Sequence, residues 1–248
     1  KAKIIITGKG IDVLKNLENT DYVIKYFDTY GNPTEKPAMT LPIPEGMTAA
    51  NVIDKYITAI GGEDKVMAIK TTMMVANATI QGTPLVMTSK SSAPNKTSQE
   101  IAVMGNVMQK SIFDGEKGYS ESRGQRTDME GDDLEEAKEG NAIISDLNYK
   151  SGTLLRIEPI DGKNTIVLKH KDNEVFYDME TGLKVKSIKV TKGPDGAEVK
   201  IPTLFSDYKE VNGVKFPYSI VQKMGPMELN FEIQEIKVNE GVTDADFK

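Results

Sequence analysis

From Lys70 to the C-terminus, the apolar residues of this chain recur at every second position, and this period restricts the fold more than any other feature. Alternation of this kind is typical of a β-strand with one dry and one solvated face. The clearest stretch places four apolar side chains on one face: Met227, Leu229, Phe231 and Ile233. About ten such segments, separated by turn signals, predict a meandering antiparallel sheet.

Local signals add detail to this sheet. Asn212-Gly213 stands between two alternating runs and predicts a tight hairpin. After Gln234 the alternation slips by one residue, which predicts a β-bulge near Glu235 and a curved sheet. Pro217 interrupts one run, and because proline donates no backbone hydrogen bond we expect it near a sheet edge.

Two segments have a helical pattern instead. Thr48 can cap a helix whose apolar stripe runs over residues 49–60 and which Gly61-Gly62 ends, and a short helical turn is expected at 63–69. The acidic segment 132–146 is also helix-prone and divides the sheet into two halves. Its acids lack the order of a calcium-binding loop, so a solvated helix explains them better.

The N-terminal part has a different pattern of predicted elements from the rest of the chain. Residues 3–7 and 22–27 suggest short strands, with a helix after Gly10, but so small a unit buries too little surface to fold alone. The proline-rich stretch 31–46 suggests an extended connector. We therefore divide the chain into an α/β remnant (1–36), a linker (37–46) and a main domain (47–248).

Composition excludes several classes of function. The 37 acidic and 31 basic residues give a net charge of −6, which does not favour nucleic acid. There is no cysteine and only one histidine, His170, so thiolate chemistry and paired-histidine zinc sites cannot be built. No apolar run reaches the ~20 residues of a membrane span. We expect no catalytic residue, no metal site and no cofactor in this chain.

The 12 methionines are the least ordinary feature of the composition. Methionine fills irregular cores and also recurs on adaptable binding surfaces, so a curved sheet rich in it could hold a flexible apolar ligand. Core filling is the simpler interpretation. The residues that would line such a concavity are Phe216, Tyr218, Ile220, Leu229, Phe231, Ile233, Met74, Met87 and Met104.

Five stretches, taken in order, resemble the half-barrel domains of the LolA-like (lipoprotein-carrier-like) class. They are residues 48–56 with 59–62, 113–119, 177–183, 205–208 with 211–218, and 236–247. The resemblance covers residues 47–248 and implies a curved half-barrel sheet wrapped over helices, in an envelope protein of the periplasm or outer membrane.

The strip from Lys3 to Pro33 resembles the end of an insulinase/pitrilysin-type zinc peptidase domain, as found before a half-barrel in Bacteroidetes-like envelope proteins. This resemblance implies that the chain is the C-terminal part of a larger protein. Any zinc site would then lie before Lys1, in a covalently attached upstream domain.

These observations leave three hypotheses about function. The first is a non-catalytic envelope module that binds a lipid acyl chain or an apolar peptide in the concave sheet and serves an attached peptidase. The second is a structural or protein-interaction domain whose concavity is filled by its own helix. An independent enzyme comes third, because no paired acid and base or activated nucleophile is evident.

Overall fold

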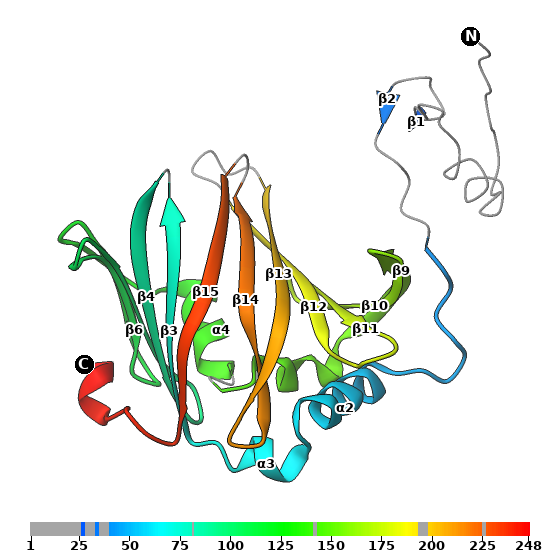
Figure 1. Cartoon of the computed structure of the whole chain (residues 1–248), viewed down its shortest axis with the longest axis horizontal. Helices are drawn as coiled ribbons and strands as arrows, with labels where there is room; N and C mark the ends of the chain where they lie inside the picture. Colours follow the sequence, from blue (N-terminus) through cyan, green and yellow to red (C-terminus); the bar gives the residue numbers. More distant parts are fainter. Residues whose placement is uncertain are drawn as a thin grey trace.

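The first and the last strand of the main sheet pair with each other at its middle. In the computed structural model, which describes residues 26–27, 33–34, 40–80, 82–140, 143–192, 198–224 and 227–248, β3 (Thr71–Ile80) lies antiparallel to β15 (Met227–Val238). Strands β3 to β8 run outward from this pair to one edge, and β9 to β15 return from the opposite edge. The result is one 13-stranded antiparallel sheet (Figure 1). The antiparallel arrangement is confirmed, and the sheet has more strands than the ten or so that the alternation predicts.

Every neighbouring pair of strands in this sheet is consecutive in the chain, apart from β3 and β15. The first half continues with β4 (Thr83–Ser92), β5 (Lys96–Val103), β6 (Asn106–Phe113), β7 (Gly118–Ser122) and β8 (Gln125–Asp128). The second half comprises β9 (Thr153–Ile160), β10 (Lys163–His170), β11 (Asn173–Asp178), β12 (Lys184–Lys192), β13 (Glu198–Val211), β14 (Val214–Met224) and β15.

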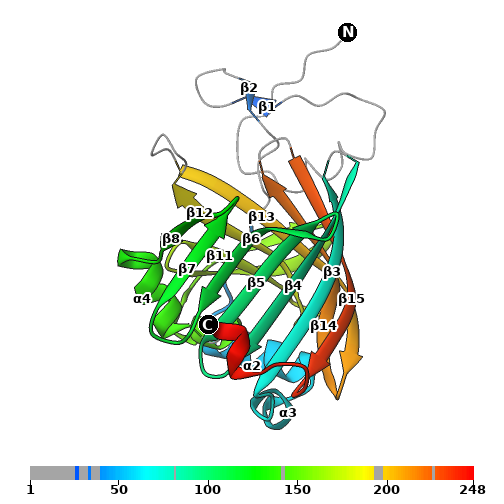
Figure 2. The same ribbon diagram turned by 90° about the vertical axis from the view of Figure 1, so that its left-hand side faces the viewer.

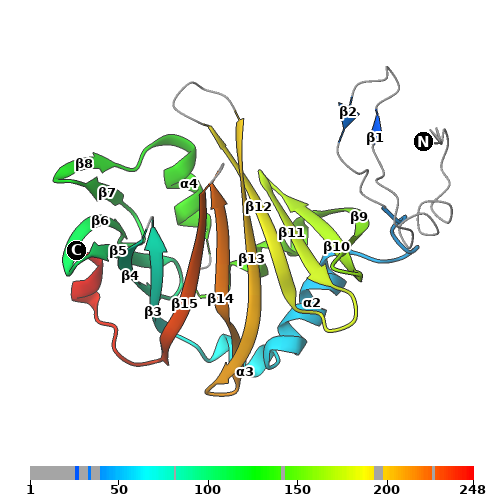
Figure 3. The ribbon, with the colours of Figure 1, turned by 45° about the horizontal axis from the view of Figure 1, so that its top comes forward.

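One crossing segment, residues 129–152, joins the two edges of the sheet. It contains α4 (Gly131–Glu139) and the 3₁₀ helix η1 (Ser145–Ser151), so the acidic segment is helical and divides the sheet as expected. Asn95, in the β4–β5 turn, donates to the Lys138 carbonyl at 3.0 Å, and Lys189 of β12 lies 3.9 Å from Glu136. Helix α4 thus connects both halves of the curved sheet on the side where α2 also lies (Figure 3). We call this side the inner face.

Helix α2 (Ala49–Ile60) begins with the predicted cap. The Thr48 hydroxyl accepts from the Asn51 amide at 3.2 Å, and the Asn51 side chain accepts from the Thr48 amide at 3.0 Å. Its apolar stripe is buried against the sheet and η1: Ala49, Val52, Ile53, Tyr56, Ile57 and Ile60. The short helix α3 (Glu63–Met67) follows, as predicted.

Helix α2 ends against the β13–β14 hairpin, which is the one predicted at Asn212-Gly213. Asn212 and Gly213 both have positive φ, and Val211 pairs with Val214 beside them. A Cβ on Gly61, whose φ is +146°, would lie 2.4 Å from the Gly213 carbonyl oxygen. Only glycine allows the helix end to approach the hairpin this closely.

The predicted bulge is confirmed, because the β15–β3 register shifts between Ile233 and Glu235. Pro217 lies in β14, which is an interior strand, opposite Tyr208 of β13. The pairing of β14 with β15, however, begins only at Ser219. Pro217 therefore stands where β14 pairs with β13 alone, so its missing N–H interrupts no pairing between β14 and β15.

The C-terminal 3₁₀ helix η2 (Asp244–Phe247) packs on the opposite, outer face of the sheet (Figure 2). Lys90 of β4 forms an ion pair with Asp246, and Phe247 is buried. This contact fixes the end of the chain over the first half of the sheet.

Of the N-terminal elements, only a two-residue pair is described, β1 (Tyr26–Phe27) with β2 (Pro33–Thr34). The expected strand at 3–7 and the helix after Gly10 lie outside the described residues. Leu41, within the predicted linker, forms an isolated bridge to Ile157 of β9, with N–O distances of 2.7 and 3.0 Å.

Candidate functional site

The inner face carries rows of side chains that are direct cross-strand partners. One row is apolar across four strands: Ile233, Ala76, Met87 and Ile101. The next row begins apolar and becomes polar: Ile236, Met74, Ser89, Gln99, Ser111 and Ser120. Because directly opposed residues project to the same face, the inner face has an apolar part at the middle of the sheet and a polar part toward β7.

The structure brings most of the predicted lining residues together. Phe231, Ile233 and Met87 are buried in one apolar cluster, and five others are half-buried against it: Met74, Phe216, Tyr218, Ile220 and Leu229. Met104 is the exception. It lies at positive φ in the β5–β6 turn and is 79% exposed, so it does not line the inner face.

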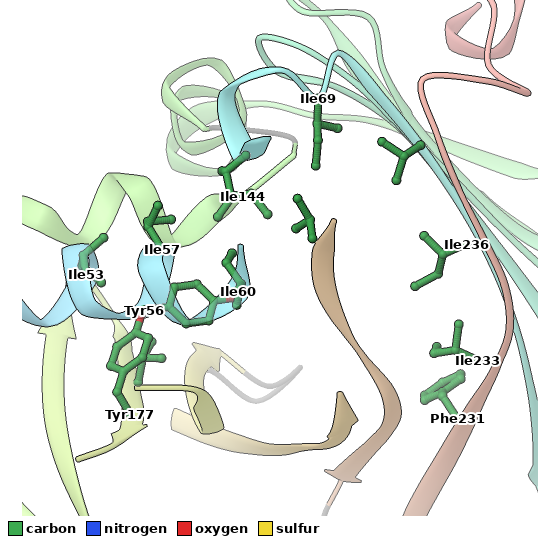
Figure 4. Close-up of a cluster of buried hydrophobic side chains, with 14 of the residues drawn as sticks. Ile53, Tyr56, Ile57, Ile60, Ile69, Ile144, Tyr177, Phe231, Ile233 and Ile236 are labelled. Atoms are coloured by element: carbon green, nitrogen blue, oxygen red, sulfur yellow. The ribbon is translucent and has the colours of Figure 1, made fainter. Parts of the chain in front are cut away.

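Helix α2 belongs to the same cluster. Figure 4 shows Phe231, Ile233 and Ile236 pointing from β15 toward the side of the sheet where Ile60 and Tyr56 lie. Ile53 and Ile60 are completely buried, whereas Ile220 and Leu229 keep partial exposure. The helix thus covers only part of the apolar surface, and the remainder is half-exposed.

A polar cluster that sequence reasoning missed lies beside α2. Asp146 of η1 is 2% exposed and accepts from the Tyr177 hydroxyl at 2.6 Å and from the Lys184 ammonium at 2.7 Å. The Tyr208 hydroxyl donates to the Lys184 carbonyl at 2.8 Å. The partners lie 31 and 38 residues from Asp146 in the chain, and no local pattern marks them.

These contacts hold the tyrosines in their neutral form. Burial, and then the negative charge of Asp146, raise the pKa of Tyr177 well above its usual value. The same two causes raise the pKa of Tyr56, whose ring centroid lies 5.4 Å from that of Tyr177, and raise the pKa of Tyr149 to about 12. Tyr177 can therefore donate to Asp146 throughout the neutral range, and the cluster anchors η1 to β11 and β12.

The turn at residues 178–182, which follows β11, contacts helix α2. Asp178 accepts from the Glu180 and Thr181 amides, both at 2.8 Å, and Lys55 of α2 donates to the Met179 carbonyl. Gly182 has positive φ, and a Cβ there would lie 3.1 Å from the Lys55 carbonyl oxygen. This turn docks α2 onto the sheet.

Two depressions, of about 290 and 350 Å³, lie over the first half of the sheet near the β8 edge. The larger is lined by Tyr119, Arg126 and Phe247, with the Arg126 guanidinium 3.7 Å from the Tyr119 ring centre. Exposed charged side chains border both, and neither includes a residue of the apolar cluster.

The described part of the chain holds no group of three or more His, Cys, Asp or Glu residues placed to bind a metal ion. His170 ends β10, and its ring lies 5.2 Å from that of Tyr149. Among the described helices, none has the length and apolar character needed to cross a membrane.

No protein-family model and no curated protein matches the sequence. Solved structures do match its fold. A LolA superfamily protein from Nitrosomonas europaea aligns with a TM-score of 0.53 at 12% identity, covering 82% of this chain and 98% of that one. A domain described as an outer membrane lipoprotein-sorting protein, from Vibrio parahaemolyticus, aligns at 0.51 and 10%, covering 80% and 95%.

A DUF1329 family protein from Desulfovibrio piger also aligns, with a TM-score of 0.51 at 12% identity, covering 82% of this chain and 98% of that one. At such low identity these likenesses concern the fold. The open, curved sheet with helices on its inner face is accordingly the fold that this chain shares with these three structures.

Proposed function

We propose that this chain is a non-catalytic binding module that holds a lipid acyl chain, or a similarly apolar segment, on the inner face of its sheet. The observation that carries the proposal is the half-exposed apolar surface formed by Met74, Ile220 and Leu229 around buried Phe231 and Ile233. This apolar surface is partly exposed on a concave face. Covering it with a guest chain removes it from water, which lowers the free energy and favours binding.

Two further considerations support this proposal. One structure of the same fold is described as an outer membrane lipoprotein-sorting protein, which points to a guest bearing acyl chains and to a place in the cell envelope, in the periplasm or at the outer membrane. Methionines also border the surface at positions 74 and 87, and their flexible side chains can adapt to a chain of variable shape.

The second candidate is a structural or protein-interaction module that binds no lipid. The contribution of α2 to the apolar cluster favours it, because Ile53 and Ile60 are completely buried there. In this case the half-exposed residues belong to a core that the helix has already closed.

A titration with acylglycerols of increasing chain length tests the proposal. Each methylene buried against the inner face contributes about 0.8 kcal/mol, so affinity should rise about fourfold per methylene until the surface is covered. Native mass spectrometry of the purified protein should also detect bound lipid. Absence of bound lipid together with no dependence on chain length would exclude the binding module.

The variant Phe231→Ala separates the two candidates. If α2 closes the core, removing this ring should cost about 3–5 kcal/mol of unfolding free energy, and lipid binding should be undetectable both before and after the substitution. If the surface is open, most of the loss should appear in lipid affinity. Val86→Ala, on the outer face of β4 and 41% exposed, is the matched control that should change neither quantity.

The attached zinc peptidase is a separate part of the proposal. It depends on the N-terminal strip, and none of the structures named above is described as a peptidase. The gene sequence upstream of Lys1 tests it directly: a zinc-peptidase motif in the same reading frame would support the attachment, and an unrelated or absent upstream domain would refute it.

A further inference from the structure

The two faces of the first half of the sheet differ in charge. Residues 71–89 contain no Asp, Glu, Lys, Arg or His, and neither do residues 101–109. Where β4 to β7 do carry charge, it lies on the outer face: Lys90, Lys96, Glu100, Lys110 and Glu121. The register places their neighbours in sequence on the inner face, which is therefore uncharged from β3 to β7.

Hydroxyl and amide groups occupy the uncharged inner face beyond the apolar cluster. This polar zone consists of Ser89, Ser91, Thr97, Gln99, Ser111 and Ser120, of which Thr97 and Gln99 are exposed and the four serines are partly buried. Within it, the Gln99 amide lies 3.3 Å from the Ser89 hydroxyl and 3.5 Å from the Met87 sulfur. The zone thus begins directly where the apolar cluster ends.

A ligand that spans the boundary at Met87 must present acyl carbon to one side and a polar group to the other. The hydroxyls and the amide can donate to and accept from ester, hydroxyl or amide groups. An ionised phosphate is a poorer match, because the zone offers no cation and the strand amides around it are engaged in the sheet.

Helix α4 adds a second reason to disfavour an anion. Its nine residues include five acids. Three of them have a lysine partner: Glu135 with Lys138 at 3.0 Å, Glu136 with Lys189 at 3.9 Å and Glu139 with Lys171 at 2.8 Å, so five acids face three lysines and a negative excess remains. The helix is tied to the β4–β5 turn through Asn95, close to the end of the polar zone. A phosphorylated headgroup on the inner face would therefore approach a negatively charged helix.

We propose that the inner face selects a neutral amphiphile, with its acyl chains on the apolar cluster and an uncharged, oxygen-rich head of the acylglycerol type on the polar zone. This inference rests on the proposed function and specifies its ligand class. The zone acts by satisfying the hydrogen bonds of a neutral head and by leaving an ionised head without a counter-charge.

Two lipids with identical chains test the selection. Dioleoylglycerol and dioleoylphosphatidic acid differ by one phosphate. Each is titrated into the full chain to which a fluorescent monoacylglycerol probe is already bound, and displacement of the probe is measured. Dioleoylglycerol should displace the probe at a concentration about tenfold lower or more. Equal potency, or tighter binding of the phosphatidic acid, would overturn the selection while leaving the proposed function intact. If neither the probe nor either lipid binds, the proposed function itself fails.

Variants locate the effect in the polar zone. Gln99→Leu combined with Ser111→Ala should weaken dioleoylglycerol about threefold to tenfold. Ser111→Lys should instead raise the affinity for phosphatidic acid and so reduce the preference for dioleoylglycerol. Thr88→Val, on the outer face of β4, is the control that should change neither affinity. If the polar-zone variants keep a native melting temperature and an unaltered preference between the two lipids, the zone does not determine which headgroup the protein prefers.

Discussion

The carboxylate of Asp146 and the ammonium group of Lys184 form an ion pair 2.7 Å apart, with side chains only 3% and 15% exposed. The Tyr177 hydroxyl donates to the other oxygen of the same carboxylate at 2.6 Å. The pair joins η1, in the crossing segment, to β12. It therefore fixes the position of the crossing segment against the second half of the sheet.

Replacing Asp146 with Ala should cost about 3–5 kcal/mol of unfolding free energy, because it leaves the buried Lys184 charge without a counter-charge, between the Tyr56 and Phe205 rings. Urea unfolding monitored by circular dichroism measures this loss. Asp54→Ala is the matched control, since Asp54 pairs with Lys150 at 2.7 Å but is 58% exposed, and it should cost less than about 1 kcal/mol. Equal losses in the two variants would contradict the role assigned to the buried pair.

The unfolding free energy should fall steeply in alkali. Burial, followed by the charges of Asp146 and Glu136, raises the pKa of Tyr149 to about 12, whereas an unfolded tyrosine titrates near 10. A pKa raised on folding gives stability that is complete below about pH 10 and is lost as the pH rises toward 12.

The comparison with Tyr149→Phe isolates this contribution, because lysines also lose their charge in the same range. The variant should show a shallower decline of the urea midpoint between about pH 10 and 12, and the same pH dependence as the wild type near neutrality. Parallel curves over the whole range would show that Tyr149 titrates alike in the folded and unfolded chain.

Gly61→Ala should destabilise the protein by about 2–4 kcal/mol, because the new methyl group would lie 2.4 Å from the Gly213 carbonyl oxygen. Gly46→Ala provides the comparison: its φ is also positive, at +78°, but no atom lies within 4 Å of the added Cβ. It should cost only about 1 kcal/mol. Similar losses would mean that backbone strain, and not the approach of α2 to the hairpin, determines the effect.

A truncated chain that begins at Thr40 should unfold cooperatively with nearly the stability of the full chain. A chain that begins at Met47 should remain cooperative but lose about 1–2 kcal/mol, because the two Leu41–Ile157 hydrogen bonds disappear. Differential scanning calorimetry distinguishes the three lengths. Loss of a cooperative transition in the Thr40 chain would show that residues 1–39 belong to the core.

Sequence patterns predicted the elements whose cause is local. The alternation around Phe231, the hairpin at Asn212-Gly213, the slip near Glu235 and the cap at Thr48 each depend on residues within a few positions of one another. The antiparallel meander follows, because short turns join neighbouring strands. Eight of the nine suggested lining residues consequently fall on or against one apolar cluster.

Patterns failed where the cause is distant or the apolar signal is weak. Strand β8 reads Gln125-Arg-Thr-Asp128 and has no dry face, so only its pairing with β7 reveals it. The Asp146 cluster forms only where η1, β11 and β12 come together in the fold. No spacing of residues in the sequence indicates that these segments lie side by side. Met104 follows an alternating run but lies just after the end of β5, in a turn where both Met104 and Gly105 have positive φ. Because the chain reverses direction there, the Met104 side chain does not lie on the inner face.

A half-barrel has two free edges, and each edge could recruit a second chain by continuing the sheet. At β9 the backbone groups of Ile157 are already bonded to Leu41, which blocks continuous pairing along that strand. At β8 all four residues are exposed, and the ion pair between Arg126 and Asp128 keeps the edge hydrated. The sheet can thus stay open at both edges without becoming a template for its own aggregation.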